Sequence, residues 1–276
     1  MNKLIKAAWT NSISRAFGSF ASYKFPAFFQ HLVNNAYVKS MGVDLSNFHP
    51  AYHYETLNEL FTRELSFKRE MPKDPTVIVS PADSLVSELG SIENGTALQV
   101  KGFEYSVDEL LTEHISDEYK EKMKHGKFIN FYLSPKDYHR YHVPTDMRVT
   151  KVIHVPGLLY PVNFTYLKKI NSLFVKNERV ILECFDNTGK LFYMVLVGAL
   201  NVGKMTLSFE PKIETNIDAS EVKVYEYDDV ELKKGDELGM FMMGSTVVIF
   251  FEEGSVELQS EVGKKVRFGE EVALKV

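Results

Sequence analysis

Three segments of the chain carry residue types that could form a reactive serine site. Ser245 follows Gly244 inside an apolar stretch and offers a hydroxyl, Asp83 lies in a proline-containing turn, and His139 and His142 form a pair three residues apart. A serine hydroxyl is a weak nucleophile at neutral pH, so it needs a base to remove its proton. Histidine, oriented by a carboxylate, commonly does this. Together the residues supply a nucleophile, a base and an orienting carboxylate.

Each of these residues also has a purely structural interpretation. Asp83, two residues after Pro81, could serve only as a turn or cap residue. His139 and His142 could bind a metal as a pair, but no third ligand is evident nearby, so no metal is expected. If the pair lies in a strand, side chains three residues apart face opposite sides, and only one histidine would point into a site.

The order of the motifs resembles that of the bacterial phosphatidylserine decarboxylase proenzymes. Six segments follow one another as they do in that family: residues 58–65, 80–84, 137–144, 174–179, 197–203 and 234–246. Each segment alone is a modest signal, whereas six in one order make a specific one. The chain departs from the family pattern at Met242-Met243 and at Asn201. Neither departure touches a reactive group.

This resemblance implies that Ser245 becomes a cofactor by cleavage of the Gly244–Ser245 bond. Ser245 Oγ would attack the Gly244 carbonyl and form an ester in place of the amide. Removal of the Ser245 Cα proton would then expel the Gly244 carboxylate. The dehydroalanine that remains would hydrolyse to a pyruvoyl group and ammonia. Gly244 suits the position before the serine because it has no side chain to obstruct the attack.

The same resemblance implies a substrate and a role for each residue. Phosphatidylserine would lose CO₂ and give phosphatidylethanolamine, with the pyruvoyl group derived from Ser245 as electron sink. Asp83 and His142 would serve self-cleavage, and His139 would contact the substrate carboxylate or donate a proton. The fragments 1–244 and 245–276 would remain associated. A homodimer is compatible with the family, whose members are often dimers.

Two other classes of function are open on the residues alone. A serine hydrolase could use Ser245, His142 and Asp83, but it would keep one intact chain. Its serine would usually lie in a Gly-x-Ser-x-Gly turn, which is absent here. A non-catalytic, membrane-binding β domain would leave the Asp, His and Ser residues without a purpose. Denaturing electrophoresis separates these classes, because only the decarboxylase predicts two fragments.

The first 43 residues differ in charge from the rest of the chain. They contain five basic residues and no Asp or Glu, although the whole chain has a net charge of −5. They are also rich in aromatic residues, among them Trp9, Phe17 and Phe20, and their apolar residues recur at helical spacing. Basic residues beside a Trp/Phe face are typical of a helix that lies on an anionic bilayer. An amphipathic helix packed on its own protein core gives the same pattern.

The sequence contains neither a predicted membrane span nor a convincing signal peptide, and these features guide the expected location of the protein. No run reaches the roughly 18 apolar residues that a membrane span requires, and the polar residues of segment 10–15 interrupt the apolar region of a signal peptide. We therefore expect a peripheral protein on the cytoplasmic face of the cell membrane, with an anionic membrane surface and phosphatidylserine as partners and no nucleic acid. The single cysteine, Cys184, excludes an internal disulfide.

The chain changes character after Pro72. Before it, apolar spacing predicts helices broken at Pro26 and near Pro50, most clearly over 56–65. After it, β-branched and aromatic runs predict strands over 76–79, 127–133, 148–155, 179–185, 191–199, 205–209, 222–227, 246–251 and 266–274, with a helical insertion over 106–124. We expect an α+β fold in which a membrane-associating helical layer, residues 1–65, packs on a β-rich catalytic core, residues 66–276.

Overall fold

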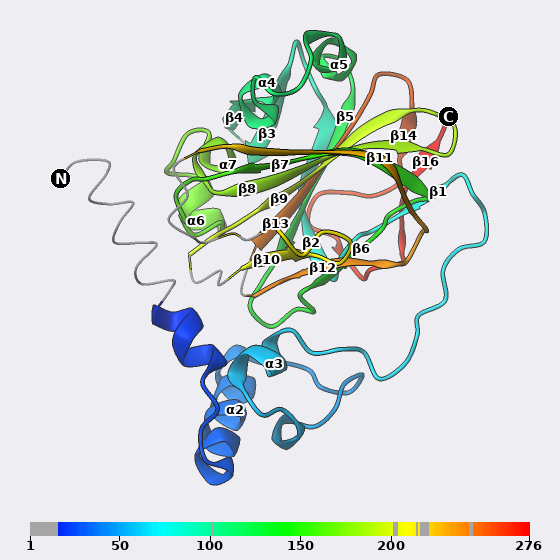
Figure 1. Cartoon of the computed structure of the whole chain (residues 1–276). Helices are drawn as coiled ribbons and strands as arrows, with labels where there is room; N and C mark the ends of the chain where they lie inside the picture. The colour runs from blue at the N-terminus through cyan, green and yellow to red at the C-terminus, as the bar shows by residue number, and fades with distance from the viewer. Residues whose placement is uncertain (1–15, 101, 201–203, 214, 216–220, 243–244) are drawn as a thin grey trace, which may run out of the picture.

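A computed structural model describes residues 16–100, 102–200, 204–213, 215, 221–242 and 245–276. In Figure 1 the N-terminal helices lie together below a larger β-rich part. The connection between the two, residues 62–76, has no regular helix or strand and runs along the outside of the molecule to the first strand. This connection therefore touches both parts of the structure.

The N-terminal helical unit, residues 16–61, consists of short helices with clear boundaries. Residues 16–22 are helical, and α2 (Ala27–Met41), the 3₁₀ turn η1 (Ala51–His53) and α3 (Leu57–Phe61) follow. Pro26 precedes α2, and Gly42 ends it at φ 66°, a left-handed conformation that glycine adopts without strain.

The helical unit has a small hydrophobic cluster of its own. Its buried members come from residues 16–22, α2, α3 and the segments between them: Ala21, Tyr37, Val43, Tyr54, Leu57, Leu60 and Phe61. A separate and much larger cluster fills the β-rich part. The unit therefore gains its own burial free energy as well as that of its contacts with the β-rich part.

The β-rich part is built on one large antiparallel sheet. Its strand order is β11-β7-β8-β9-β13-β5-β2-β15. The bounds in that order are Lys223–Leu232, Met147–Val155, Arg179–Asp186, Leu191–Val197, Ser245–Phe251, Lys127–Leu133, Ser84–Ser91 and Lys265–Val266. Strand β13 is buried along its whole length between β9 and β5. Val, Ile and Phe dominate its sequence, as a central strand requires.

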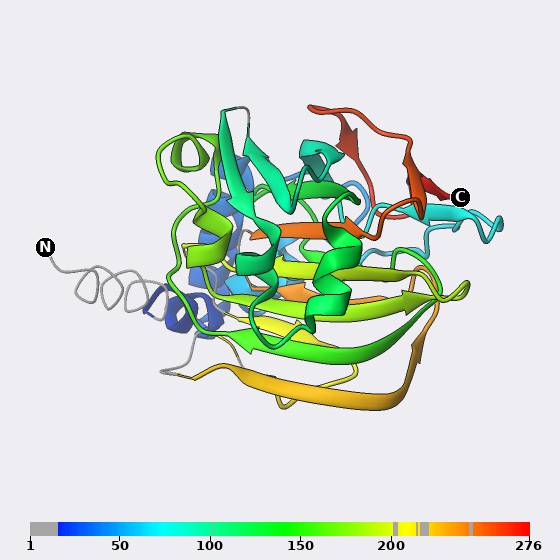
Figure 2. The same cartoon turned by 90° about the horizontal axis from the view of Figure 1, so that it is seen from above.

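Three smaller sheets and four short helices complete this part. The orders are β1-β16-β14 (Val77–Val79, Glu271–Lys275, Val256–Leu258), β10-β12-β6 (Met205–Leu207, Glu237–Phe241, Arg140–His142) and β3-β4 (Thr96–Val100, Phe103–Ser106). The helices are α4 (Val107–Leu111), α5 (Asp117–Met123), α6 (Phe164–Leu167) and α7 (Leu173–Lys176). Figure 2 shows α4 and α5 crossing one face of the large sheet.

The α+β class expected from the sequence is confirmed, and most long strands lie where the apolar runs predicted them. The prediction was wrong in three places. The helix over 56–65 ends at Phe61, the insertion over 106–124 is two short helices, and the strand over 266–274 is divided into β15 and β16. Strands β2, β3, β4, β6, β12 and β14 were not predicted. Trp9 and Gly244 lie outside the described residues.

Candidate active site

Ser245 is the first residue of the central strand β13. It pairs with Leu133 of β5, and its neighbour Thr246 pairs with Val197 of β9. The Ser245 side chain is completely buried, and its hydroxyl has no hydrogen-bond partner within the described structure. A buried hydroxyl without a partner costs folding free energy, so this position invites a functional explanation.

Asp83 lies in the turn directly before β2, and its carboxylate binds Arg69. Arg69 Nη1 donates to Oδ1 over 2.5 Å, and Arg69 Nη2 donates to Oδ2 over 2.9 Å. The backbone N–H of Phe268 also donates to Oδ1, over 2.8 Å. A two-pronged pair of this kind fixes both the position and the plane of the carboxylate. Arg69 is therefore the principal partner of Asp83.

His142, in β6, has both ring nitrogens engaged by other residues. Nδ1 lies 3.1 Å from the carbonyl oxygen of Gly235, and Nε2 lies 3.1 Å from the hydroxyl of Tyr138. A carbonyl only accepts, so Nδ1 carries the proton and Nε2 accepts from Tyr138. Burial lowers the pKa of His142 from its ordinary value to about 4, and the imidazole is neutral at pH 7.

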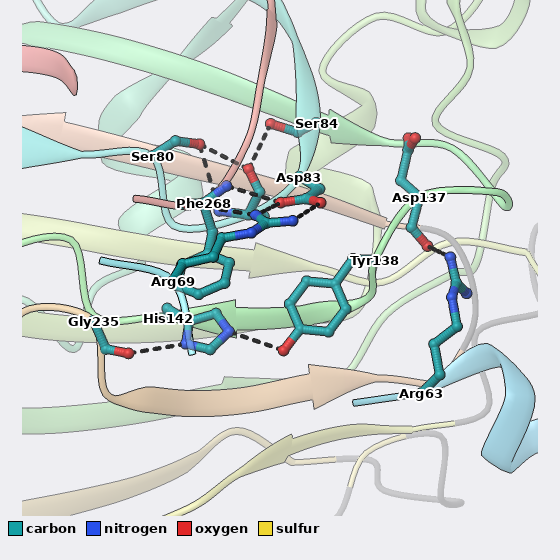
Figure 3. A network of polar contacts seen from close by, with 11 residues as sticks. Arg63, Arg69, Ser80, Asp83, Ser84, Asp137, Tyr138, His142, Gly235 and Phe268 are labelled. Atoms are coloured by element: carbon teal, nitrogen blue, oxygen red, sulfur yellow. Dashed lines mark hydrogen bonds and ion pairs between the residues drawn. The ribbon is translucent and has the colours of Figure 1, made fainter. Parts of the chain in front are cut away.

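The ring of Phe268 lies between the groups that were expected to form a triad. It stacks on the His142 imidazole at 3.7 Å and 8°, and the Arg69 guanidinium lies 4.7 Å from its centroid (Figure 3). Within the described residues, the Asp83 carboxylate accepts from Arg69 and Phe268 and makes no hydrogen bond with His142. Its charge still opposes the fall in the pKa of His142. A direct Asp83–His142 contact would require both residues to change partners.

His139 precedes β6 and is completely buried. Its Nδ1 lies 2.9 Å from the backbone carbonyl of Asp137 and therefore carries the proton, which leaves a lone pair on Nε2. Nε2 has no hydrogen-bond partner within the described residues. Burial lowers the pKa of His139 to about 3. The Phe61 ring packs against the imidazole, with the centroids 4.0 Å apart.

Two backbone connections place His139 near the start of β13. The N–H of Phe241, four residues before Ser245, donates to the carbonyl of His139 over 2.9 Å. From the other side, Leu133 pairs with Ser245, and the chain reaches His139 six residues later. His139 is thus tied to chain segments on both sides of β13, and both His139 Nε2 and Ser245 Oγ are buried without a hydrogen-bond partner among the described residues.

Two open pockets lie beside these residues. One, of about 760 Å³, is lined by His142, Tyr138 and Phe268 together with Arg69. The other, of about 450 Å³, is lined by Asp83 and by basic residues that include Arg267. Ser245 lines neither of the two. Within the described residues, no group of three His, Cys, Asp or Glu side chains has the arrangement that could hold a metal ion.

Sequence reasoning missed Arg69, Tyr138, Gly235 and Phe268 as parts of the site. Tyr138 could have been found, because it lies inside the His-containing motif and four residues before His142. Arg69 and Phe268 carry no local signal. Arg69 lies in the irregular connection before β1, and Phe268 lies between β15 and β16 near the C-terminus. Only the folded chain brings them to Asp83 and His142.

The comparisons with known proteins agree along almost the whole chain. The family model described as phosphatidylserine decarboxylase matches residues 57–274. A phosphatidylserine decarboxylase proenzyme of Helicobacter pylori is 44% identical over 268 residues, which are 96% of this chain and 97% of that protein. Proteins of the same name from Campylobacter jejuni and Glaesserella parasuis are 41% and 38% identical. They cover 96% and 87% of this chain and 99% and 83% of their own lengths.

These matches define an enzyme of the carboxy-lyase class. The chain belongs to the phosphatidylserine decarboxylase family, as the order of its motifs indicated. The serine hydrolase alternative is not favoured by any of these relatives. No helix in the described part of the chain has the length and apolar content needed to cross a bilayer.

Proposed function

We propose that the protein decarboxylates phosphatidylserine to phosphatidylethanolamine and CO₂, with a pyruvoyl group made from Ser245. The observation that carries the proposal is the position of Ser245. It is a fully buried serine at the first residue of a central strand, and its hydroxyl has no hydrogen-bond partner among the described residues. Ser245 fits the precursor of such a group because no described residue holds its hydroxyl in another contact.

Maturation would begin with attack by Ser245 Oγ on the Gly244 carbonyl and end with two chains, 1–244 and 245–276. We assign the base to His142 and its orientation to Asp83. The support is that the imidazole of His142 is neutral at pH 7 and can therefore accept a proton. For Asp83 to orient it, the carboxylate must leave Arg69 and the imidazole must leave Gly235. Self-cleavage in this proposal includes that exchange.

In decarboxylation, the pyruvoyl group would act as the electron sink for the electron pair that remains when CO₂ leaves. His139 would exchange a proton with the substrate through Nε2, the ring nitrogen that has no hydrogen-bond partner within the described part of the chain. The residue is fully buried against Phe61. A dry site of this kind favours a step in which the substrate's carboxylate charge is lost, because water no longer stabilises that charge.

The N-terminal region, residues 1 to about 43, would bind the cytoplasmic face of an anionic membrane. Several apolar side chains of its described part are exposed: Phe20 (43%), Tyr23 (60%), Phe28 (86%), Phe29 (44%) and Leu32 (57%). Phe17, by contrast, packs against the cluster of the helical unit. The exposed set supports a lipid-facing surface, since a substrate with acyl chains must be reached at a bilayer.

The two chains of the mature enzyme would stay together. Residues 245–276 contribute β13 to the middle of the large sheet, β15 to its edge and β16 to the sheet with β1. The fragment is thereby hydrogen-bonded to β5, β9, β2 and β1 of the larger chain. Association of two such two-chain molecules into a dimer is compatible with the family.

The test of the proposed function is an assay of purified protein with phosphatidylserine in mixed micelles. We expect release of CO₂ and formation of phosphatidylethanolamine by the wild type, and neither by Ser245→Ala, because that variant has no precursor for the pyruvoyl group. A matched control is Ser255→Ala. It removes another buried serine hydroxyl of the same fragment, one that donates to Glu252, and should retain activity. Full activity of Ser245→Ala would overturn the proposal.

A further inference from the structure

Among the described residues, Arg63 is a buried cation that forms no salt bridge with a carboxylate. Its side chain follows α3 and is 2% exposed. Nη1 donates to the carbonyl of Leu60 over 3.3 Å, and the guanidinium lies 4.5 Å from the centroid of the Phe48 ring. Burial lowers its pKa. Keeping a buried charge on carbonyls and one ring is costly, so the arrangement points to a specific structural task.

The other contacts of Arg63 reach the loop that leads to His139. Nη2 donates to the carbonyl of Lys136 over 2.9 Å and to that of Asp137 over 3.1 Å, the second contact being visible in Figure 3. The hydroxyl of Tyr37, in α2, donates to the carbonyl of Pro135 over 2.6 Å. Side chains from the N-terminal part of the chain thus bind three consecutive carbonyls of one loop.

The same loop is also closed from within. The Asp137 carboxylate accepts from the backbone N–H and the hydroxyl of Ser134, over 2.7 and 2.6 Å. The turn from residue 134 to residue 137 is therefore fixed at its side chain and at its carbonyls. His139 follows two residues later, so the fixed backbone of residues 134–137 also restricts the position of the His139 backbone.

The Asp137 carbonyl is the acceptor that Arg63 and His139 share. It receives Nη2 of Arg63 and Nδ1 of His139, over 3.1 and 2.9 Å. A carbonyl has two lone pairs and can serve both donors. Because Arg63 holds this oxygen in place, it holds the acceptor that keeps the proton of His139 on Nδ1 and the lone pair on Nε2.

We infer that Arg63 is a positioning residue for His139, and through it for decarboxylation. By this inference the N-terminal part of the chain completes the site, since without Arg63 the imidazole loses its fixed tautomer and ring orientation. The inference rests on the proposed role of His139. Arg63 itself touches neither Ser245 nor a reacting atom in the described structure, so its effect is indirect.

Two variants of Arg63 test this role. Arg63→Met removes both carbonyl contacts, and Arg63→Lys can restore one of them with an ammonium group. We expect Arg63→Met to lower kcat, per mole of cleaved chain, by about tenfold or more with KM changed by less than about threefold, in line with the loss of an orienting partner. Arg63→Lys should recover part of the lost kcat.

The decisive readout is the tautomer of His139. In protein labelled with ¹⁵N-histidine, the wild type should show one neutral tautomer for His139, protonated at Nδ1, with His139→Gln identifying the signal. Arg63→Met should convert this signal to a mixture of tautomers. This measurement does not depend on activity. Absence of phosphatidylethanolamine formation by the wild type would defeat the proposed function, whereas the spectrum would still decide the role of Arg63.

Arg179→Met is the matched control for loss of a buried arginine. Arg179 is 3% exposed and donates to carbonyls of Leu110, Val175 and other residues, away from the loop of residues 134–137. The Arg179→Met variant should have a lower melting temperature than the wild type, but the His139 signal and the kcat of the folded enzyme should be unchanged. Two results would overturn the inference: an unchanged His139 spectrum and kcat in folded Arg63→Met, or the same losses in Arg179→Met.

Discussion

Asp83 and Arg69 form a two-pronged ion pair in which each carboxylate oxygen accepts one guanidinium N–H, over 2.5 and 2.9 Å. The side chains are only 19% and 11% exposed, so water screens their interaction little. The carboxylate expected to orient His142 is thus held by an arginine fourteen residues earlier in the chain. In the proposed mechanism, Asp83 must leave this ion pair before it can orient His142.

The strength of this pair is open to measurement by a double-mutant cycle on the free energy of unfolding. Made in the Ser245→Ala chain, which cannot be cleaved, Arg69→Met, Asp83→Asn and the double variant should give a coupling energy of about 1–3 kcal/mol, because the two side chains share a buried contact. The exposed pair Lys24–Glu55, with side chains 64% and 60% exposed, is the control. It should couple by less than about 1 kcal/mol. Equal coupling energies in the two pairs would contradict the claim that burial strengthens the Arg69–Asp83 interaction.

Maturation gives a second prediction. Intact-mass analysis of the wild type should show a 1–244 chain and a 32-residue C-terminal chain, residues 245 to 276, whose N-terminus is blocked to Edman sequencing. Ser245→Ala should remain one chain. Asp83→Asn and His142→Ala should slow cleavage by at least about a hundredfold, the lower end of the range for a general base. Cleavage of either variant at the wild-type rate would remove it from the maturation mechanism.

Substitutions of His139 and His142 should have different effects on chain cleavage and on turnover. Because we assign His139 to decarboxylation, His139→Ala should mature more nearly at the wild-type rate yet turn over slowly. The measurement is kcat per mole of cleaved chain beside the rate of chain cleavage. Equal losses in both rates would show that the two histidines share the maturation step.

The two buried histidines predict a specific dependence of stability on pH. Burial lowers the pKa of His142 to about 4 and that of His139 to about 3, whereas histidine in an unfolded chain titrates near 6.5. Between these values the unfolded chain binds more protons than the folded one. The stability contributed by the neutral imidazoles is therefore fully present above pH 6.5 and is lost as the pH falls towards 4 and 3.

Urea denaturation of the Ser245→Ala chain, which cannot be cleaved, measures this effect at pH values from 7.5 to 4.5, and the variants below are made in the same background. Each such histidine contributes a slope of about 1.4 kcal/mol per pH unit within its window. His142→Gln should reduce the slope of the unfolding free energy against pH by close to the amount that one histidine contributes. His53→Gln, which changes an exposed histidine, should leave it unchanged. A slope equal to the wild type in His142→Gln would show that His142 is not held neutral.

Membrane binding is tested best on side chains that the protein does not bury. Phe28→Ser with Leu32→Ser should weaken co-sedimentation with vesicles containing phosphatidylserine, because these side chains are 86% and 57% exposed. A larger set, Trp9, Phe17 and Phe20 to Ser, should act in the same direction. Phe17 packs inside the helical unit, however, and its loss also affects folding. Added salt should weaken binding without abolishing it, since only the basic residues are screened.

Val262→Ser is the matched control for this experiment. It removes an apolar side chain that is 55% exposed in the C-terminal segment, away from the helices. It should leave sedimentation unchanged, and all these variants should still cleave. Unchanged sedimentation of the Phe28/Leu32 variant would indicate that the exposed apolar surface serves a contact other than lipid.

Strands with a simple apolar pattern were predictable, and elements that depend on distant partners were not. The predicted runs 127–133 and 246–251 correspond to β5 and β13 because nearly every residue in them is buried. Strand β12 was missed because Gly239, a poor strand residue, occupies its centre. A Cβ there would lie 1.9 Å from the carbonyl oxygen of Thr206. Glycine is needed for close packing, which local propensity does not reveal.

The same distinction applies to the candidate site: residues with a local motif were predictable, whereas their distant contact partners were not. Ser245, Asp83 and both histidines were predicted as site residues because their residue types and motifs are suited to acid–base chemistry, and that assignment stays a prediction. The partners of Asp83 were not found, since Arg69 and Phe268 lie 14 and 185 residues away in sequence. No spacing rule connects such positions, and the fourteen-residue segment between Arg69 and Asp83 crosses an irregular connection whose path only the folded structure defines.

The central position of β13 has a consequence for the order of events in the life of the protein. In the proposed maturation, the uncut chain folds as one molecule, so its refolding is first order and independent of concentration. Cleavage before Ser245 would leave two chains that refold only after they associate, which makes recovery second order. Folding before cleavage is therefore the faster route to the assembled sheet. Unfolded mature enzyme would recover slowly at low concentration, and the lifetime of the active form would be set by its rate of unfolding.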